Sequence, residues 1–350
     1  MPKIRQDFQP ETPPWLIEDW LPLGHRGMDA APEGSFKTIL GCWISACIAS
    51  GSPIFGQPVY QGNVMIVDEE TPKSSLEYHL ERFSRGLGFR YKDLPIHTFS
   101  MSGFNFGRKT KMNELLKLAD DINPVFIRMD SLLAMMPSGR QRFSENSDSI
   151  GETIRDDLNQ LLSEERSILL AAHSKKYIAE LTLDELQQME MQSIVRGHSS
   201  IVGEGCDTGY IIKKISENPN PTRFCIITKI RRQAIPTNRL KYIEMVEEKY
   251  GQGWARLEEI PARKLPPSKI AIELFKLFKI PDGRNNYNHS SQWIRHTCAF
   301  NTMRECRFAI TELLMRKAII EASPQNYKMN EERALQCDPD YLRILDPPNT

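Results

Sequence analysis

The residues that could most clearly bind a ligand lie in Arg26–Thr38, which has the pattern of a strand, a tight loop and the start of a helix. Lys37 and Thr38 stand where a phosphate-binding loop has its Lys and Ser/Thr. In such a loop, backbone N–H groups and the helix N-terminus cradle a polyphosphate. Lys37 would reach the terminal phosphates, and the Thr38 hydroxyl would hold Mg²⁺. The loop residues expected to line the phosphates are Ala31, Pro32, Glu33, Gly34, Ser35 and Phe36.

Two positions of this loop depart from the usual pattern. Ala31 replaces the first glycine, and Phe36 replaces the glycine just before the lysine. Glycine is preferred there because it adopts unusual dihedral angles and lets a ligand approach the backbone. Taken alone, the stretch fits an ordinary surface loop as well as it fits a nucleotide site.

Three later apolar runs support the nucleotide interpretation, because each reads as a buried strand that ends in polar residues. Gly62–Asp68 is followed by two glutamates, Pro124–Asp130 ends in an aspartate, and Ser167–Ala172 is followed by His173. Functional side chains of α/β proteins collect at the carboxyl ends of such strands. Each run alone could be a solvated turn or a strand-end cap, but together and in this order they predict a site for ATP and Mg²⁺. The second run has the four-apolar-then-Asp pattern of a Walker B strand, interrupted by Arg128.

Apolar periodicity predicts the elements that position these residues. Helices are expected at residues 37–50, 72–87, 111–122 and 149–162, with a short helix starting at Thr182. Further strands are expected at Ile96–Ser100 and, as an antiparallel edge, at Asp207–Ile215 and Arg223–Lys229. The Pro-rich residues 1–24 form an extended strap anchored by Trp15 and Trp20. Alternating strands and helices predict an α/β fold with a mostly parallel sheet flanked by helices.

Composition narrows the classes of protein. The chain of 350 residues has 45 basic and 45 acidic residues, which excludes a strongly basic coat for nucleic acid but leaves room for a local basic face. Its 7 cysteines include no CxxC pair, which indicates a reducing compartment. The spacing of His289, His296, Cys298 and Cys306 fits no common metal site. The chain shows no signal-like or membrane-spanning segment, so we expect a cytoplasmic protein without a membrane partner.

These motifs resemble the RecA-like P-loop ATPases of the RepA-type hexameric replicative helicases of plasmids and phages. The resemblance covers Trp15 to Arg231. It rests on Pro-Pro-Trp-Leu-Ile, Ala-Pro-Glu-Gly-Ser-Phe-Lys-Thr, Gly-Asn-Val-Met-Ile-Val-Asp-Glu-Glu-Thr-Pro, Asp-Ser-Leu, Ala-Ala-His-Ser-Lys-Lys, Arg-Gly-His-Ser-Ser and Thr-Lys-Ile-Arg, in this order. It implies a RecA-like ATPase domain over residues 25–232.

The resemblance implies roles for individual residues. Glu70 matches the catalytic glutamate that activates the attacking water, with Glu69 as the near alternative, and Asp130 matches the Walker B carboxylate. His173 matches the sensor of the γ-phosphate. Lys229 and Arg231 match the basic pair that a neighbouring subunit inserts into the site, with Arg231 as the arginine finger. Arg196 is a second candidate for that contact. A homo-oligomer, a hexameric ring, follows from the resemblance.

Contacts with single-stranded DNA in the channel of such a ring are expected from the residues after His173. Lys175 and Lys176 lie there, but the acidic residues Glu180, Asp184, Glu185 and Glu190 make it a poor surface for phosphates. Arg140 and Arg142 are better candidates. A solvated basic face is an equally good interpretation of all four cations.

Beyond Arg231 the sequence changes character. Residues 233–265 read as a linker with a short helix near Ile243–Tyr250. Residues 266–335 resemble a winged helix-turn-helix, and residues 336–350 form a tail. The helices of this module are expected at Ser268–Phe278, Ser290–Thr297 and Asn301–Arg316, and the wing strands at Ala318–Ala322 and Asn326–Met329. Arg304 and Arg307 on the third helix, with Lys328 on the wing, could contact duplex DNA; the same module could instead contact a protein.

Two functional classes therefore remain open. The first is an ATP-hydrolysing DNA motor, a RepA-like helicase or helicase-like ATPase of a mobile element. The second is a DNA-binding regulator or scaffold that uses ATP to control its assembly without unwinding. A phosphate-loop domain without turnover is a third, simpler possibility.

Overall fold

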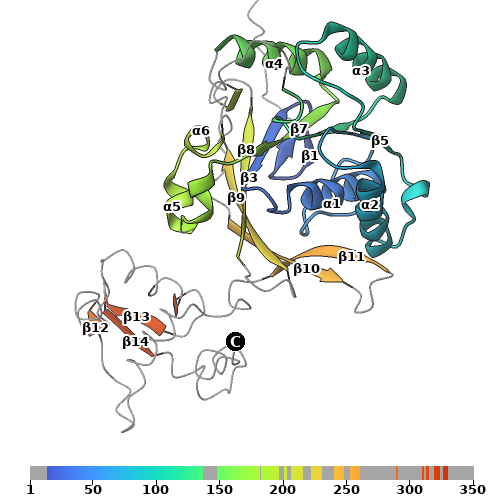
Figure 1. Ribbon diagram of the computed structural model, residues 1–350. Coiled ribbons are helices and arrows are strands. Elements are labelled where there is room, and N and C mark those ends of the chain that lie inside the picture. The colour runs from blue at the N-terminus through green and yellow to red at the C-terminus, as the bar shows by residue number, and fades with distance from the viewer. Residues whose placement is uncertain are drawn as a thin grey trace, which may run out of the picture. The chain divides into compact units, whose positions relative to one another are not determined.

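A computed structural model describes residues 14–136, 148–181, 183–196, 201–202, 206–215, 222–230, 240–247, 253–260, 289–290, 310, 313–314, 319–323 and 326–329. The chain divides into two compact units, residues 1–259 and 260–350. The first unit is built on a large sheet with helices against both faces (Figure 1). The second unit has a small antiparallel sheet.

Nine strands form the sheet of the first unit, in the order β11-β10-β9-β8-β3-β7-β6-β4-β5. Their bounds are β3 Arg26–Ala31, β4 Val64–Asp68, β5 Ile96–Ser100, β6 Phe126–Asp130, β7 Ser167–His173, β8 Thr208–Lys214, β9 Arg223–Ile230, β10 Leu240–Glu247 and β11 Ala255–Ile260. From β8 to β5 the neighbouring strands are parallel, whereas β9 runs antiparallel to both β8 and β10. The predicted α/β fold is therefore confirmed, and so is the antiparallel pairing of β8 with β9, but this pair is not the edge of the sheet, because β10 and β11 extend the sheet beyond it.

Two pairs of longer helices cover opposite faces of the parallel strands (Figure 1). One pair is α1 Lys37–Ser50 and α2 Lys73–Gly86, and the other is α3 Lys109–Ile122 and α4 Asp148–Leu161. Along β4, Val64 and Ile66 join the core around α1 and α2, while Met65 and Val67 join the core around α3 and α4. This alternation explains the continuous apolar run in the sequence, because both faces of the strand are buried.

Shorter elements complete the first unit. They are β1 Trp15–Ile17, β2 Leu21–Pro22, α5 Leu183–Gln188 and α6 Met191–Ile194, with single turns at Tyr91–Asp93 and Lys176–Ala179. The antiparallel pair β1–β2 belongs to the predicted N-terminal strap, where Trp20 is buried against Phe55 and Tyr210. Among the described helices, none is long and apolar enough to cross a bilayer.

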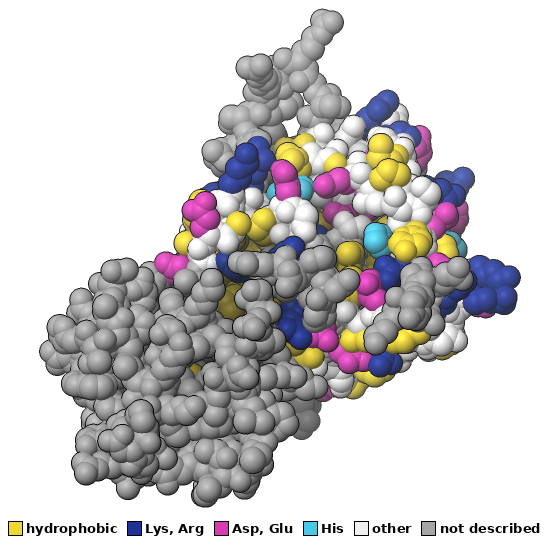
Figure 2. Space-filling model, turned by 60° about the horizontal axis from the view of Figure 1, so that its bottom comes forward, with side chains coloured by type: hydrophobic (Ala, Val, Ile, Leu, Met, Phe, Trp, Pro, Cys, Tyr) yellow, Lys and Arg dark blue, Asp and Glu magenta, His cyan; other side chains and the backbone are white. Residues whose placement is uncertain are grey.

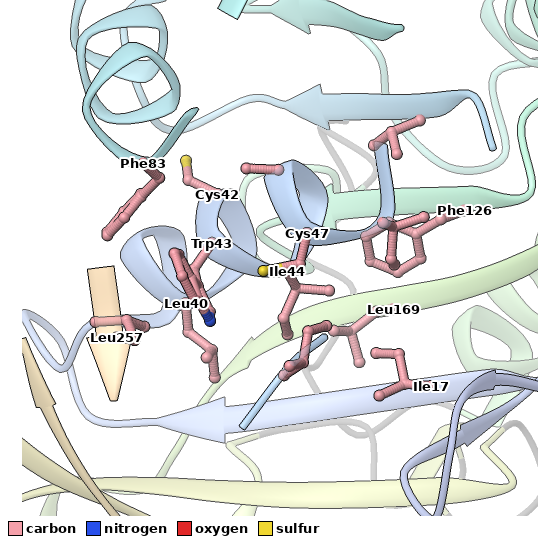
Figure 3. Packing of buried hydrophobic residues seen from close by; sticks show 14 of the residues in the cluster. Ile17, Leu40, Cys42, Trp43, Ile44, Cys47, Phe83, Phe126, Leu169 and Leu257 are labelled. Atoms are coloured by element: carbon pink, nitrogen blue, oxygen red, sulfur yellow. The ribbon is translucent and has the colours of Figure 1, made fainter. Parts of the chain in front are cut away.

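The predicted linker at residues 233–265 and its helix near Ile243–Tyr250 are wrong in the described part. Residues 240–247 and 253–260 are strands β10 and β11 of the main sheet. Several of their charged residues form ion pairs: the ammonium of Lys241 lies 2.5 Å from the Glu259 carboxylate, and Arg82 of α2 lies 2.5 Å from Glu247. Leu257 of β11 packs in the same cluster as Leu40, Trp43 and Phe83 (Figure 3).

The described residues of the second unit include a three-stranded sheet in the order β12-β14-β13, all antiparallel. Its strands are β12 His289–Ser290, β13 Ile319–Ser323 and β14 Asn326–Met329. The hairpin predicted as a wing is present as β13–β14 and carries Lys328. Nearly all of the three predicted helices, and both Arg304 and Arg307, lie outside the described residues, so the winged-helix interpretation stays a prediction.

Packing of β11 against α2 predicts the effect of one small substitution. Gly86 ends α2, and a Cβ added there would clash with the Ala255 carbonyl oxygen. Gly86→Ala should therefore lower the free energy of unfolding by about 1–3 kcal/mol, although alanine is the better helix former. Chemical denaturation measures this change. Ser75→Ala on the exposed side of α2 is the control, with an expected change within about 0.5 kcal/mol. An unchanged or raised stability of Gly86→Ala would contradict the docking of β11.

Candidate functional site

The loop between β3 and α1 has the shape of an anion cradle. Gly34 and Phe36 both have left-handed backbone conformations, with φ of 71° and 63°. Helix α1 follows without a side-chain cap, so the N–H groups of its first turn remain available to an anion. The Lys37 ammonium folds back to donate to the Ala31 carbonyl at 3.4 Å. The loop thus brings a buried lysine and a helix N-terminus to one place.

A hydroxyl and two carboxylates lie beside this loop. The Thr38 hydroxyl donates to Asp130 Oδ2 at 2.9 Å, and Asp130 stands in register with Asp68 at the ends of β6 and β4. Asp68 Oδ1 accepts from the N–H groups of Glu70 and Thr71 at 2.9 and 2.7 Å. Its Oδ2 is buried and has no partner among the described residues. Oxygen donors of this kind suit Mg²⁺.

Burial changes the pKa of both carboxylates. It raises the pKa of Asp68 to about 6, with a further contribution from the nearby charge of Asp130. It also raises the pKa of Asp130, against the opposing effect of Arg128. A cation bound beside these carboxylates would favour their charged form. Asp68 Oδ2, unpartnered within the described part of the chain, and the oxygen donors beside it therefore fit a divalent cation.

Glu70 and His173 meet across the carboxyl ends of β4 and β7. His173 Nε2 lies 3.4 Å from Glu70 Oε2, and His173 is buried while about half of the Glu70 side chain is exposed. Partial burial acts to raise the pKa of Glu70, but Ser131, His173 and Lys37 together lower it below its usual value. Glu70 is therefore an ionised carboxylate that water can reach, as a general base requires.

Glu69, the alternative to Glu70, is engaged elsewhere. Its carboxylate accepts the N–H groups of Ser102, Gly103 and Phe104 at 3.0–3.1 Å, and the Ser102 hydroxyl at 2.6 Å. These bonds hold the loop that follows β5. The geometry thus separates two adjacent glutamates, one that organises a loop and one that faces the candidate site.

Arg128 is the residue whose importance sequence reasoning missed. It is buried in β6 and makes two bonds with Asp29 of β3, at 2.5 and 3.0 Å. It also donates to the Lys37 carbonyl at 3.3 Å and lies 3.7 Å from Asp130 Oδ2. Helix α1 approaches so closely that a Cβ on Gly41 would lie 2.7 Å from Arg128 Nε. The available signal was a pair of opposite charges, Asp29 and Arg128, inside two strands that read as buried.

Other predicted residues lie apart from this cluster or outside the described residues. Lys229 of β9 donates to the Gln187 carbonyl of its own chain, and burial lowers its pKa. Lys176 is exposed, Lys175 is half-buried, and the N–H of Arg196 donates to the His173 carbonyl at 2.8 Å. Arg140, Arg142 and Arg231 lie outside the described residues.

The chain is similar to known proteins in two respects. A family model described as an AAA domain matches residues 2–177, about half of the chain. A solved structure of a KaiC-like protein from the hyperthermophilic archaeon Pyrococcus horikoshii OT3 matches with 15% sequence identity and a TM-score of 0.45. That match covers 70% of this chain and 94% of the other. Among curated proteins, none matches the chain.

Removing the Arg128 charge tests the buried cluster. Arg128→Met leaves Asp29 as an unpaired buried charge, so the free energy of unfolding should fall by about 3–5 kcal/mol. Chemical denaturation at neutral pH measures the loss. Arg85→Met on the surface of α2 removes a half-exposed ion pair with Glu81 and should cost less than about 1 kcal/mol. Equal losses for the two variants would show that the buried cluster does not form.

The raised pKa of Asp68 predicts how stability depends on pH. Between about pH 4 and pH 6 the folded protein binds more protons at Asp68 than the unfolded chain does, so the contribution of Asp68 to stability falls as pH rises. Asp68→Asn keeps an acceptor for the two backbone N–H groups but removes this titration. In metal-free buffer, urea unfolding at pH 4 and pH 7 should show that the variant gains stability relative to wild type at the higher pH.

Asp156→Asn, at an exposed position of α4, controls for the loss of a carboxylate in general. An Asp68→Asn difference that does not change between the two pH values would contradict the predicted titration.

Proposed function

The chain belongs to the AAA domain family, and we propose that it is an ATP-hydrolysing DNA motor similar to the RepA-type hexameric replicative helicases. Its first unit, a mostly parallel α/β sheet that carries the phosphate loop, would be a RecA-like core of the P-loop ATPase class. One observation carries the proposal: five side chains from four separate segments converge at one end of the parallel strands. They are Lys37, Thr38, Glu70, Asp130 and His173.

Binding of the triphosphate falls to the β3–α1 loop. Its backbone N–H groups and the α1 N-terminus would face the phosphates, and Lys37 would exchange the Ala31 carbonyl for a phosphate oxygen. Thr38 and Asp130 would hold Mg²⁺ together. When bound, Mg²⁺ neutralises charge on the β- and γ-phosphate oxygens.

Glu70 is the proposed catalytic base. Its carboxylate would orient a water molecule and take a proton from it as the water oxygen bonds to the γ-phosphorus and the bond to the ADP oxygen breaks. His173, within 3.4 Å of Glu70, would contact the γ-phosphate and so connect its presence to the position of Glu70.

A neighbouring copy would complete the site. In this proposal Arg231 of one subunit reaches the nucleotide of the next as an arginine finger, with Lys229 beside it and Arg196 as the second candidate. Hydrolysis then requires a homo-oligomer, and we propose a hexameric ring.

DNA contact is proposed at two places. Lys175, Lys176, Arg140 and Arg142 would touch single-stranded DNA in the channel, and Arg304, Arg307 and Lys328 of a winged-helix module would touch duplex DNA. The hairpin β13–β14 supports a wing in the second unit.

An ATP-controlled regulator or scaffold remains the second candidate, and one observation favours it. Basic and acidic side chains are interspersed over the described surface seen in Figure 2. A surface of this kind attracts the DNA backbone weakly.

Steady-state ATPase assays of the full chain test the proposal, with and without single-stranded DNA at a fixed salt concentration. Wild type should hydrolyse MgATP faster with DNA. Lys37→Ala and Glu70→Gln should each lower kcat by about 100-fold or more, because they remove the phosphate-binding cation and the base. Glu77→Gln, at a half-exposed position of α2, is the matched control and should keep wild-type activity.

A mass measurement with and without nucleotide separates the two candidate functions. ATP-dependent assembly without DNA-stimulated turnover would favour the regulator. A wild-type protein that hydrolyses no ATP with any DNA would rule out the motor.

A further inference from the structure

Phe36 holds an uncommon conformation at the most sensitive point of the phosphate loop. Its φ of 63° and ψ of 13° are left-handed, a region that glycine adopts without penalty and a phenylalanine does not. The Phe36 carbonyl accepts the N–H of Leu40 at 2.8 Å, so this residue is the N-cap of α1. The orientation of Phe36 therefore sets the direction in which Lys37 and Thr38 leave the loop.

Phe36 also makes a specific contact through its ring. The rings of Phe36 and Phe224 are stacked, with centroids 5.5 Å apart and an interplanar angle of 13°. Phe224 is fully buried in β9 and pairs with Lys214 of β8 and Ile243 of β10. Stacked aromatic pairs contribute beyond their buried area, so the contact offsets the backbone strain.

The rest of the loop has no comparable anchor at its tip. Glu33 and Gly34 are exposed, and a Cβ added to Gly34 would meet no atom within 4 Å. Phe36, in contrast, is half-buried and packs against the core around α1. The side chain that replaces glycine thus fastens the end of the loop to strand β9.

We propose that Phe36 is a positioning residue, which by stacking on Phe224 holds the phosphate loop in its nucleotide-binding shape before nucleotide arrives. The inference rests on the proposed ATP site. A glycine at this position would leave the loop free to sample other shapes, and affinity falls in proportion to the fraction of molecules in the competent shape. Phe36 therefore acts on binding, and the chemical step is left to Glu70.

Two measurements on the full chain test this inference. The first is amide hydrogen exchange of residues 35–40 in the nucleotide-free protein, and the second is the Kd of MgATP by calorimetry together with kcat. Phe36→Gly and Phe224→Leu should each speed exchange of the loop and raise the Kd by about three- to tenfold, and Phe224→Leu, which lies outside the phosphate loop, should keep kcat within about twofold of wild type. Phe36→Tyr keeps the stacked ring, so its loop exchange and its Kd for MgATP should be close to those of wild type.

Phe83→Leu is the matched control. Phe83 is also buried, belongs to the same core and makes a ring contact with Trp43 at 5.7 Å, so its loss costs similar packing away from the loop. It should change neither loop exchange nor Kd.

Three outcomes would overturn a specific claim. Unchanged loop exchange and Kd in Phe36→Gly would overturn the positioning role, and so would a Phe83→Leu effect as large as that of Phe224→Leu. Absence of MgATP binding by wild type would overturn the proposed function, while hydrogen exchange would still decide whether Phe36 orders the loop.

Discussion

The buried ion cluster of Asp29, Arg128 and Asp130 is the constraint on which the candidate site depends. A guanidinium in the protein interior is stabilised by charged partners and hydrogen bonds that replace its hydration. The two Nη groups of Arg128 find such partners on β3, on β6 and at the first carbonyl of α1, whereas its buried Nε has no hydrogen-bond partner among the described residues. Strand β3, which leads into the phosphate loop, the Asp130 carboxylate and the first residue of α1 are thereby connected through a single side chain.

Parallel strands explain why the other functional groups meet. Asp68 and Asp130 end neighbouring strands in register, and Ala31 is in register with His173 on the next pair. Residues far apart in sequence thus meet at the carboxyl ends of neighbouring strands without long loops. The loop after β5 is held at the same end of the strands because its N–H groups donate to the Glu69 carboxylate. Glu69 therefore has a structural role, although it directly precedes Glu70 in the chain.

Sequence patterns predicted the parallel core well and its antiparallel extension poorly. Helix α1 was predicted with its observed bounds because its first residues follow the phosphate loop and Gly51, with φ of 74°, ends it, although residues 40–49 are buried on every side rather than along one apolar stripe. Strands β10 and β11 were mistaken for a linker because charges interrupt their apolar positions. Those charges are paired across strands, as in Lys241–Glu259, and such pairing is invisible in sequence. The partner of Arg128 was hidden for the same reason: Asp29 lies 99 residues away, and the strand order that joins them comes from the fold.

The contact between Gly41 and Arg128 also affects how this protein can diverge. A methyl group at position 41 has no room while an arginine occupies position 128, and a shorter residue at 128 would leave Asp29 as a lone buried charge. Substitutions at positions 29, 41 and 128 are therefore expected to be coupled, because a change at one position needs a matching change at the others. Covariation of these three positions among homologues would identify the members of the family that share the buried Asp29–Arg128 ion pair.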